Sequence, residues 1–214
     1  SLDPVVFERI TNTSGEKLKS ILNAIDEAID CDLGQVRINS VIRRGINEQD
    51  IDRLIEQFEH LPVSLRFIEF MDVGNHNRWK YNDVVSSSEI HNHLRKRMNL
   101  IPIDSTHRGE VAQRWEVEGK KGFEIGFISS VSQPFCGDCT RARISAEGRL
   151  FTCLFASKGT DLKSILRAHD GNRIQEVVSE IWKSRNDRYS ELRSKTPKPG
   201  TIILPKIEMS YIGG

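Results

Sequence analysis

The sequence lacks a strong excess of either charge. Its 31 Lys and Arg residues nearly balance its 30 Asp and Glu residues, which leaves a net charge of +1. Nucleic-acid-binding domains usually carry a clear basic excess, so we expect no nucleic-acid partner. Any anion that this chain binds must be held by a local cluster of basic side chains.

Long hydrophobic runs are also missing. No stretch reaches the roughly 20 consecutive apolar residues that a membrane-spanning helix needs, and the first residues show no secretion signal. We therefore expect a cytoplasmic protein with no membrane partner. A length of 214 residues allows one large domain, or one domain with a smaller appendage.

Cysteine is scarce, yet three of the four cysteines lie within one short stretch, at Cys136, Cys139 and Cys153. In a chain with no secretion signal, such a group indicates metal binding rather than a disulfide framework. Three thiolates without a fourth cysteine nearby suit a [4Fe–4S] cluster with one open iron, because such clusters normally have four cysteine ligands.

Two other interpretations of the cysteines stay open on spacing alone. A structural zinc requires four ligands. The candidates for the fourth ligand, all distant in the sequence, are Cys31, His107 and His169. Cysteines buried without a metal are the remaining alternative. The six histidines form no ligand spacing among themselves. His91 and His93 are two apart on an expected helix and should not face the same way.

The segment between Cys139 and Cys153 predicts a β-hairpin with its turn at Ala146-Glu147-Gly148. The midpoint of these two cysteines falls in the turn, so we expect them to face each other across the hairpin base. A turn at Gly137 would bring Cys136 back to join them. Local geometry alone can therefore gather the three thiols.

Arginines accompany the cysteines. Cys139, Arg141 and Arg143 alternate, so in an extended strand they would share one face. Arginine suits phosphate because its planar guanidinium donates two parallel hydrogen bonds and stays charged. We expect Arg37 and Arg66 to face inward from two parallel strands, where they could complete an anion pocket. For each arginine alone, a solvated surface charge is the alternative.

Strands and helices alternate through the first half of the chain, which is typical of βαβ units and a parallel sheet. We expect helices at about 16–30, 51–58 and 87–98, and strands at 35–42 and 63–70. Capping boxes are expected at Thr13 with Glu16 and at Ser86 with Glu89, and Asn47 is a candidate cap.

The second half has a different pattern. We expect short antiparallel strands at 115–118 and 123–128, short helices at 161–167 and 172–184, and an extended tail over 195–214. Parallel strands are normally apolar on both faces, but Arg37, Asn39 and Arg66 break this rule. They would either line the lumen of a βα barrel, where ligands bind, or lie on the solvated face of an edge strand.

Three segments resemble the GTP 3′,8-cyclases, the radical-SAM enzymes of molybdenum-cofactor synthesis. They are residues 36–47, residues 65–74, and residues 135–143 with the motif Cys136-Gly-Asp-Cys139. Glu147-Gly148, Cys153-Leu-Phe and the terminal Ile212-Gly-Gly also fit. The resemblance covers essentially the whole chain, and it favours an iron–sulfur cluster over zinc.

This resemblance implies a fold and two domains. Residues 1–105 would form the later part of an incomplete (β/α) radical-SAM barrel. Residues 106–214 would form a C-terminal subdomain of antiparallel strands and short helices that binds a cluster and GTP and ends in an extended Gly-Gly tail. The family's N-terminal C-x3-C-x2-C motif and its Gly-Gly-Glu-Pro segment are both missing. We therefore expect the chain to be inactive by itself.

The resemblance also implies a reaction. In the family, a first [4Fe–4S] cluster cleaves S-adenosyl-L-methionine, and the resulting radical takes the ribose 3′ hydrogen of GTP before ring closure at C8. A second cluster, held by three cysteines, binds the guanine. A further enzyme, cyclic pyranopterin monophosphate synthase, uses the product. The whole enzyme is expected to be a homodimer.

Site residues follow from the same resemblance. Cys136, Cys139 and Cys153 would hold the C-terminal [4Fe–4S] cluster. GTP would contact Arg37, Arg66, Arg141 and Arg143. S-adenosylmethionine would contact Ser1 and Met71, and Gly213-Gly214 would reach into the active site. The alternatives are a truncated GTP- or cluster-binding module without radical chemistry, and a zinc-stabilised interaction domain. The sequence upstream in the gene distinguishes the first of these.

Overall fold

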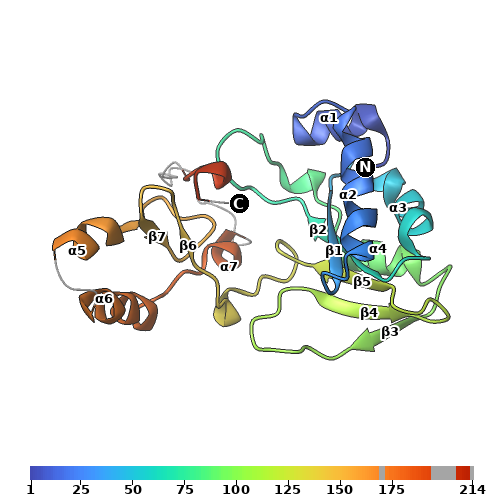
Figure 1. Ribbon diagram of the computed structural model, residues 1–214. Helices are drawn as coiled ribbons and strands as arrows, with labels where there is room; N and C mark the ends of the chain where they lie inside the picture. Colours follow the sequence, from blue (N-terminus) through green and yellow to red (C-terminus); the bar gives the residue numbers. More distant parts are fainter. Residues whose placement is uncertain (169–171, 194–205, 213–214) are drawn as a thin grey trace. The chain divides into compact units, whose positions relative to one another are not determined.

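A computed structural model describes the chain as a mixed α/β protein (Figure 1). The described residues are 1–168, 172–193 and 206–212. They form two compact units. The first unit contains residues 1–71 and 80–133, and the second contains residues 72–79 and the described residues from 134 onward.

The first unit is built on a five-stranded sheet with the order β1-β2-β5-β4-β3. Its strands are β1 (Val36–Ile42), β2 (Val63–Glu69), β3 (Leu100–Ile103), β4 (Gln113–Val117) and β5 (Glu124–Ile128). β1, β2 and β5 run parallel, whereas β4 is antiparallel to both β5 and β3. The predicted parallel strands and the predicted antiparallel pair are both confirmed, and both belong to this one sheet.

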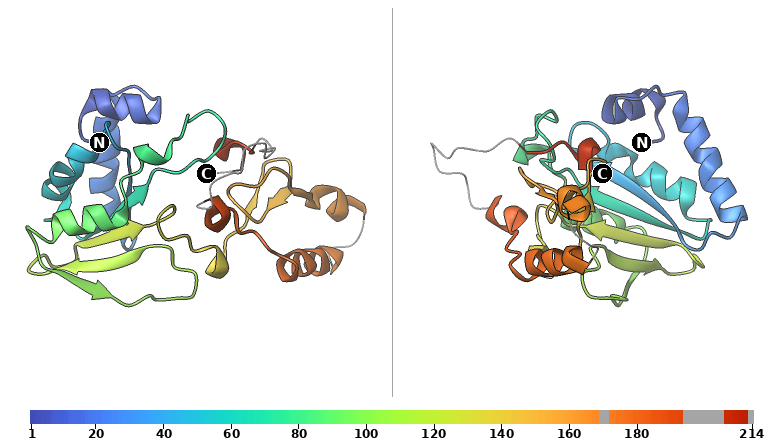
Figure 2. Two further views of the ribbon diagram at one scale, coloured as in Figure 1. Left: turned by 180° about the vertical axis from the view of Figure 1, so that it is seen from behind. Right: turned by 60° about the vertical axis from the view of Figure 1, so that its left-hand side comes forward.

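Helices cover one face of that sheet. They are α2 (Lys17–Asp30), α3 (Ile51–Phe58) and α4 (Ser87–Leu94). The first unit also contains α1 (Pro4–Thr11), which has no buried residue, and 3-10 turns at Glu48–Asp50 and Tyr81–Asp83. Ile55 and Phe58 of α3 pack in one apolar core with Leu65 and Phe67 of β2, and the predicted stripe of α2 packs against it. Figure 2 shows α2, α3 and α4 beside the strands from two further directions. None of the described helices has the length and apolar composition needed to cross a membrane.

The helix ends only partly follow the sequence pattern. The capping box of Ser86 and Glu89 is confirmed, with the Ser86 hydroxyl accepting the Glu89 N–H. The predicted box at Glu16 is wrong, because Glu16 precedes α2 without a side-chain cap. Asn47 does not cap α3 either. Its side chain instead accepts the N–H of Arg43 at 2.8 Å and so fixes the turn after β1.

The opposite face of the sheet carries several polar side chains. Arg37 and Asn39 of β1 are exposed, and Arg66 of β2 is partly buried. Asn39, Arg66 and Gly126 lie side by side in register on three neighbouring parallel strands. A Cβ at position 126 would come within 2.9 Å of the Arg66 Cγ. Glycine at this position therefore gives the Arg66 side chain room to lie across the sheet.

A buried carboxylate joins three segments at the carboxyl end of β2. Glu69 is 1% exposed and accepts the N–H of Ser87 at 2.8 Å, which ties β2 to the start of α4. Its other oxygen accepts the N–H groups of Val131 and Ser132 at 2.7 and 2.8 Å. A buried charge is tolerated when it is fully hydrogen-bonded, so Glu69 fixes the chain that follows β5.

The second unit contains a small antiparallel sheet and several short helices. The strands are β6 (Arg143–Ile144), β7 (Arg149–Phe151) and β8 (Thr160–Asp161). The helices are α5 (Leu162–Ala168), α6 (Asn172–Lys183) and α7 (Tyr189–Arg193), with 3-10 turns at Cys136–Asp138 and Met209–Ile212. The two predicted helices correspond to α5 and α6, whereas α7 was not predicted. Most of the predicted extended tail lies outside the described residues.

Residues 72–79 belong to this second unit because of ionic and hydrogen-bonded contacts with its C-terminal part. The Asp72 carboxylate accepts the Tyr189 hydroxyl at 2.5 Å, pairs with Lys206 at 2.7 Å, and pairs with Arg193. Burial opposes the charge of Asp72, but the hydrogen bonds from Lys206 and Tyr189 outweigh it and lower its pKa. Asn75 adds a bond from its side-chain amide to the Lys206 carbonyl at 2.6 Å.

One boundary between the two units falls between residues 133 and 134. β4 and β5 lie beyond residue 105 but remain in the first unit because β5 pairs with β2. Residues 72–79, by contrast, come before residue 105 but belong to the second unit.

Candidate functional site

The three cysteines lie on two loops of the second unit. Cys136 begins the 3-10 turn that closes with the Cys139 N–H donating to the Cys136 carbonyl at 3.3 Å. Cys153 follows β7, and all three cysteines are partly buried. The predicted hairpin is confirmed by the pairing of Arg143 with Phe151. The pairing ends there, so the cysteines sit beyond the hairpin base and not within its ladder.

The thiol of Cys139 has a cationic environment. Burial opposes its ionisation, but hydrogen bonds from the backbone and guanidinium of Arg141 and from Arg185 outweigh burial, so the pKa of Cys139 is lowered. A thiolate is the form that binds metals. Cys139 is therefore suited to act as a ligand.

The thiol of Cys153 is shifted in the other direction. Burial raises its pKa, and the charges of Asp187, Cys136 and Cys139 raise it further. A hydrogen bond from the Phe155 N–H to the Cys153 sulfur, at 3.4 Å, partly offsets these effects. The three cysteines thus lie near enough to repel one another when ionised. A bound cation would relieve that repulsion.

Arg185 connects the two cysteine-bearing loops, and the sequence did not indicate it. Its guanidinium donates to the Cys139 carbonyl at 2.7 Å and to the Thr152 carbonyl at 2.6 Å, directly before Cys153. The Asp187 carboxylate pairs with the Arg185 Nε at 3.1 Å. The Arg185 side chain is only 10% exposed. No local pattern predicts such a role, because Arg185 lies 46 residues after Cys139 in an irregular segment.

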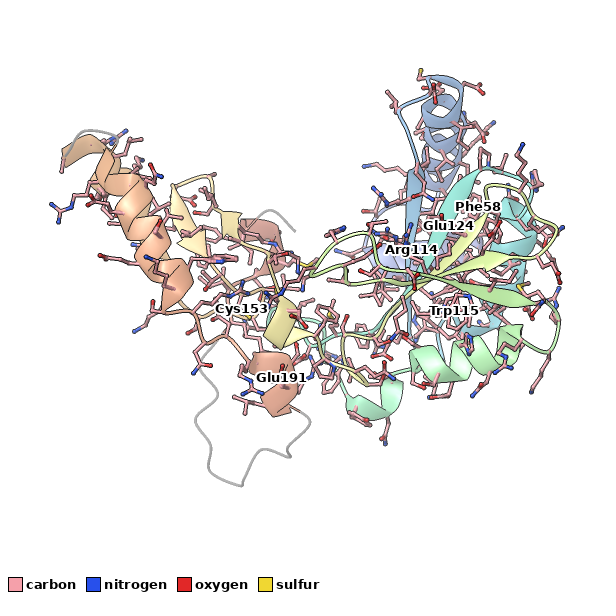
Figure 3. All side chains as sticks on the ribbon, turned by 90° about the horizontal axis from the view of Figure 1, so that it is seen from below. Phe58, Arg114, Trp115, Glu124, Cys153 and Glu191 are labelled. Atoms are coloured by element: carbon pink, nitrogen blue, oxygen red, sulfur yellow. The ribbon has the colours of Figure 1, made fainter. Side chains whose placement is uncertain are left out.

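A second contact reaches the cysteine turn from α7. The Glu191 carboxylate accepts the N–H of Gly137 at 3.1 Å, between Cys136 and Cys139. Figure 3 shows Glu191 on α7 beside these loops. Together, Arg185 and Glu191 hold the backbone of both loops that bear the cysteines.

Arg141 and Arg143 add positive charge beside the thiols. Arg141 is exposed, and its guanidinium lies 5.0 Å from the centre of the Phe135 ring. Arg143 is partly buried, and burial together with the charge of Arg141 lowers its pKa. The expected strand through residues 139–143 is wrong in extent, because only Arg143 and Ile144 pair. Arg141 and Arg143 nonetheless lie close enough to interact electrostatically, so both place positive charge beside the thiols.

Arg37 and Arg66 lie in the first unit, on the face of the sheet opposite the apolar core. Burial lowers the pKa of Arg66, and the charge of Arg37 lowers it further, so the two cations are close enough to repel each other. The buried Nε of Arg66 has no hydrogen-bond partner among the described residues. Neighbouring cations with unused donors would be stabilised by an anion such as a phosphate.

The positions expected to contact S-adenosylmethionine are also in the first unit. The Ser1 hydroxyl donates to the carboxylate of Asp50, which is buried, and accepts the Asp3 N–H at 3.0 Å. Met71 is partly buried just after β2. The Gly213-Gly214 tail lies outside the described residues.

The arrangement of the thiols decides which metal the site could hold. Within the described parts of the chain, no three His, Cys, Asp or Glu side chains converge closely enough to hold a single metal ion. A cubane cluster makes a weaker demand, because each thiolate binds a different iron. Three partly buried thiols, two hydrogen-bonded loops and nearby cations fit the ligand chemistry of an iron–sulfur cluster better than that of zinc.

Comparison with known proteins identifies the family. Residues 63–191 match the family described as Molybdenum Cofactor Synthesis C, which is more than half of the chain. The chain belongs to this family, whose matched region includes all three clustered cysteines and both neighbouring arginines.

Individual relatives carry a more particular name. The chain is similar to a GTP 3′,8-cyclase of Xanthomonas axonopodis pv. citri, with 43% identity over 214 residues. Proteins of the same name from Acidothermus cellulolyticus and Staphylococcus saprophyticus are 39% and 37% identical to it. In each case all of this chain is covered, but only 62%, 65% and 62% of the relative. The chain thus spans about three fifths of the length of these relatives.

Proposed function

We propose that the chain is the C-terminal, cluster- and GTP-binding portion of a GTP 3′,8-cyclase of molybdenum-cofactor synthesis. The observation that carries this proposal is the joining of the two cysteine-bearing loops by Arg185, with Arg141 and Arg143 beside the thiols. The names of the similar proteins support the same activity.

Cys136, Cys139 and Cys153 would hold a [4Fe–4S] cluster. Such a cluster, with three protein ligands, supplies one iron that can take a nitrogen or oxygen of a substrate. Arg141 and Arg143 would bind the triphosphate through their planar guanidiniums. In the first unit, the neighbouring cations Arg37 and Arg66 would contact GTP as well, and they would orient it by its phosphates.

The remaining parts of the reaction belong to the whole protein. Apart from the three clustered cysteines, the sequence has only Cys31, which is exposed, so its residues do not fit a second cluster. For the whole enzyme we propose that Ser1 and Met71 contact S-adenosylmethionine, that the enzyme is a cytoplasmic homodimer, and that cyclic pyranopterin monophosphate synthase uses its product.

Anaerobic reconstitution with iron and sulfide tests the proposal. The chain should take up about four irons, as cubane clusters do, and the reconstituted protein should bind GTP. Metal analysis after reconstitution measures the first property and calorimetric titration the second. Stoichiometric zinc without iron uptake would instead favour a zinc-stabilised domain. Iron uptake without GTP binding would leave a cluster-binding module.

Arg185→Lys should weaken retention of the cluster. Lysine keeps the charge but cannot donate to both the Cys139 and Thr152 carbonyls in the fork geometry of arginine. A hydrogen bond from a charged group contributes about 1.5–3 kcal/mol, so iron should be lost to a chelator at least about tenfold faster. The rate of bleaching of the cluster absorbance measures this loss.

Arg167→Lys is the matched control for this experiment. Arg167 lies on α5 in the same unit and is exposed, and no contact joins it to the cysteine loops in the described structure. It should release iron at the wild-type rate. Equal rates in the Arg185→Lys and Arg167→Lys variants would show that Arg185 does not position the ligands.

A further inference from the structure

The turn that follows the third cysteine places a hydrogen-bond donor on its sulfur. The Phe155 N–H donates to the Cys153 Sγ at 3.4 Å. A second bond closes the same turn, from the Ala156 N–H to the Cys153 carbonyl at 3.2 Å. Figure 3 labels Cys153 in the second unit, and each of these three residues is partly buried. The backbone after Cys153 therefore turns back onto this proposed cluster ligand.

Three side chains contact the Phe155 ring. The ring stacks on that of Tyr189 in α7, with centres 4.5 Å apart and an interplanar angle of 20°. The Lys206 Nζ lies 5.4 Å from its centre, and the Arg193 guanidinium carbon lies 5.5 Å from it. The Lys206 and Arg193 side chains are only 10% and 8% exposed. Stacked rings attract each other, and cation–π contacts strengthen when the cation is shielded from water, so these contacts hold the ring in place.

Asp72 joins the three side chains that contact this ring. Its carboxylate accepts the Tyr189 hydroxyl at 2.5 Å and pairs with Lys206 at 2.7 Å. The same carboxylate also pairs with Arg193. Buried charges are tolerated when they are paired and hydrogen-bonded, so the group around Asp72 gives the Phe155 ring a fixed support.

The C-terminal segment supports the same turn through its backbone. The Lys206 N–H donates to the Asn75 Oδ1 at 3.0 Å, and the Lys206 carbonyl accepts the Asn75 amide at 2.6 Å. One residue further on, the Ile207 N–H donates to the Ala156 carbonyl at 3.1 Å. The turn that bears the Phe155 N–H is thus held both by its aromatic ring and by its backbone.

A donor placed on a cysteine sulfur changes the electronic properties of a cluster bound there. Reduction potentials of iron–sulfur clusters depend on hydrogen bonds to the sulfurs, among other factors. Reduction adds one electron, while no bond is made or broken and no proton is transferred. The added negative charge spreads over irons and sulfurs, so a donor at a sulfur stabilises the reduced form more than the oxidised form. The hydrogen bond therefore raises the reduction potential.

We propose that Phe155 is a positioning residue that raises the reduction potential of the cluster held by Cys153. Its N–H supplies the hydrogen bond to the Cys153 sulfur, and the contacts of its ring keep the N–H in that place. This inference rests on the cluster of the proposed function. It concerns an electronic property of that site, which is measured without GTP and without the radical reaction.

Two variants at position 155 test the hydrogen bond in the reconstituted chain. Phe155→Pro has no N–H, whereas Phe155→Tyr keeps both the N–H and an aromatic ring. At a fixed electrode potential, the ratio of reduced to oxidised cluster should fall about three- to tenfold in Phe155→Pro, and tenfold corresponds to about 59 mV for one electron. Phe155→Tyr should keep the wild-type ratio. An anaerobic redox titration, followed by the electron paramagnetic resonance signal of the reduced cluster, measures both.

Variants on α7 test the ring contacts, and they carry the test if Phe155→Pro does not bind iron. Tyr189→Ala removes the stacked ring, so the potential should be lower than in the wild type. Tyr189→Phe keeps the ring and should restore the wild-type potential. Leu192→Ala is the matched control, because Leu192 lies on the same helix but is 59% exposed, and its potential should not change. Comparison at equal iron content separates a change of potential from a loss of metal.

The outcomes distinguish this inference from the proposed function. Wild-type potentials in Phe155→Pro and Tyr189→Ala, with about four irons bound, would overturn the inference and leave the cluster in place. A lower potential in Phe155→Pro alone would keep the hydrogen bond but exclude the role of the ring. If the wild-type chain takes up no iron, the proposed cluster itself fails, and the inference fails with it.

Discussion

Alanine at Cys136, Cys139 or Cys153 is expected to remove most of the iron from the reconstituted chain. Each substitution leaves a cubane with two protein thiolates where three are proposed. Arg185 still holds the backbone of both cysteine-bearing loops in each variant, so the loss should be of metal and not of fold. Iron and sulfide analysis measures the loss, and circular dichroism of the metal-free chain checks the fold.

Cys31→Ala is the control for these variants. Cys31 follows α2 in the first unit and is exposed. Its replacement should leave about four irons bound. Full iron content in any one of the three clustered variants would exclude that cysteine as a ligand. Loss of iron in Cys31→Ala alone would indicate that the metal binds in the first unit.

Lysine at Arg141 or Arg143 should weaken GTP binding by about tenfold or more. Lysine keeps the positive charge but loses the two parallel hydrogen bonds that a guanidinium gives to a phosphate. A lost charge-assisted bond costs about 1.5–3 kcal/mol, and each 1.4 kcal/mol is a tenfold change in affinity. Calorimetric titration of GTP into the reconstituted chain measures the effect.

Two comparisons sharpen this experiment. Arg95→Lys, at an exposed position just after α4, should bind GTP like the wild type. Iron content should be unchanged in Arg141→Lys and Arg143→Lys, since neither residue is proposed as a ligand. If GTP affinity is unchanged in both, the two arginines are ordinary surface charges and the phosphate-binding part of the proposal fails.

The sequence predicted those elements whose stabilising contacts are local. The apolar stripe of α2 and the alternation in β1 identified both elements to within about a residue. The capping box at Ser86 was found because both partners lie within four residues. The β6–β7 hairpin was found for the same reason, since a turn at Gly148 sets its register.

Contacts between distant residues were not predictable in this way. The sequence did not indicate that β5 pairs with β2, because the paired residues are about sixty positions apart. Arg185 has no sequence pattern of its own, and its partners become evident only when both cysteine loops are placed.

The contribution of residues 72–79 to the second unit makes that unit discontinuous in the chain. A single cut between residues 133 and 134 would leave Asp72 and Asn75 on the other fragment. The partners of Asp72 in Arg193 and Lys206 follow it by 121 and 134 residues. During synthesis, these two partners of Asp72 are therefore made only after 121 and 134 further residues have been added to the chain. The second unit can therefore be completed only late in synthesis. Residues 134–214 expressed by themselves would lack residues 72–79, including Asp72 and Asn75.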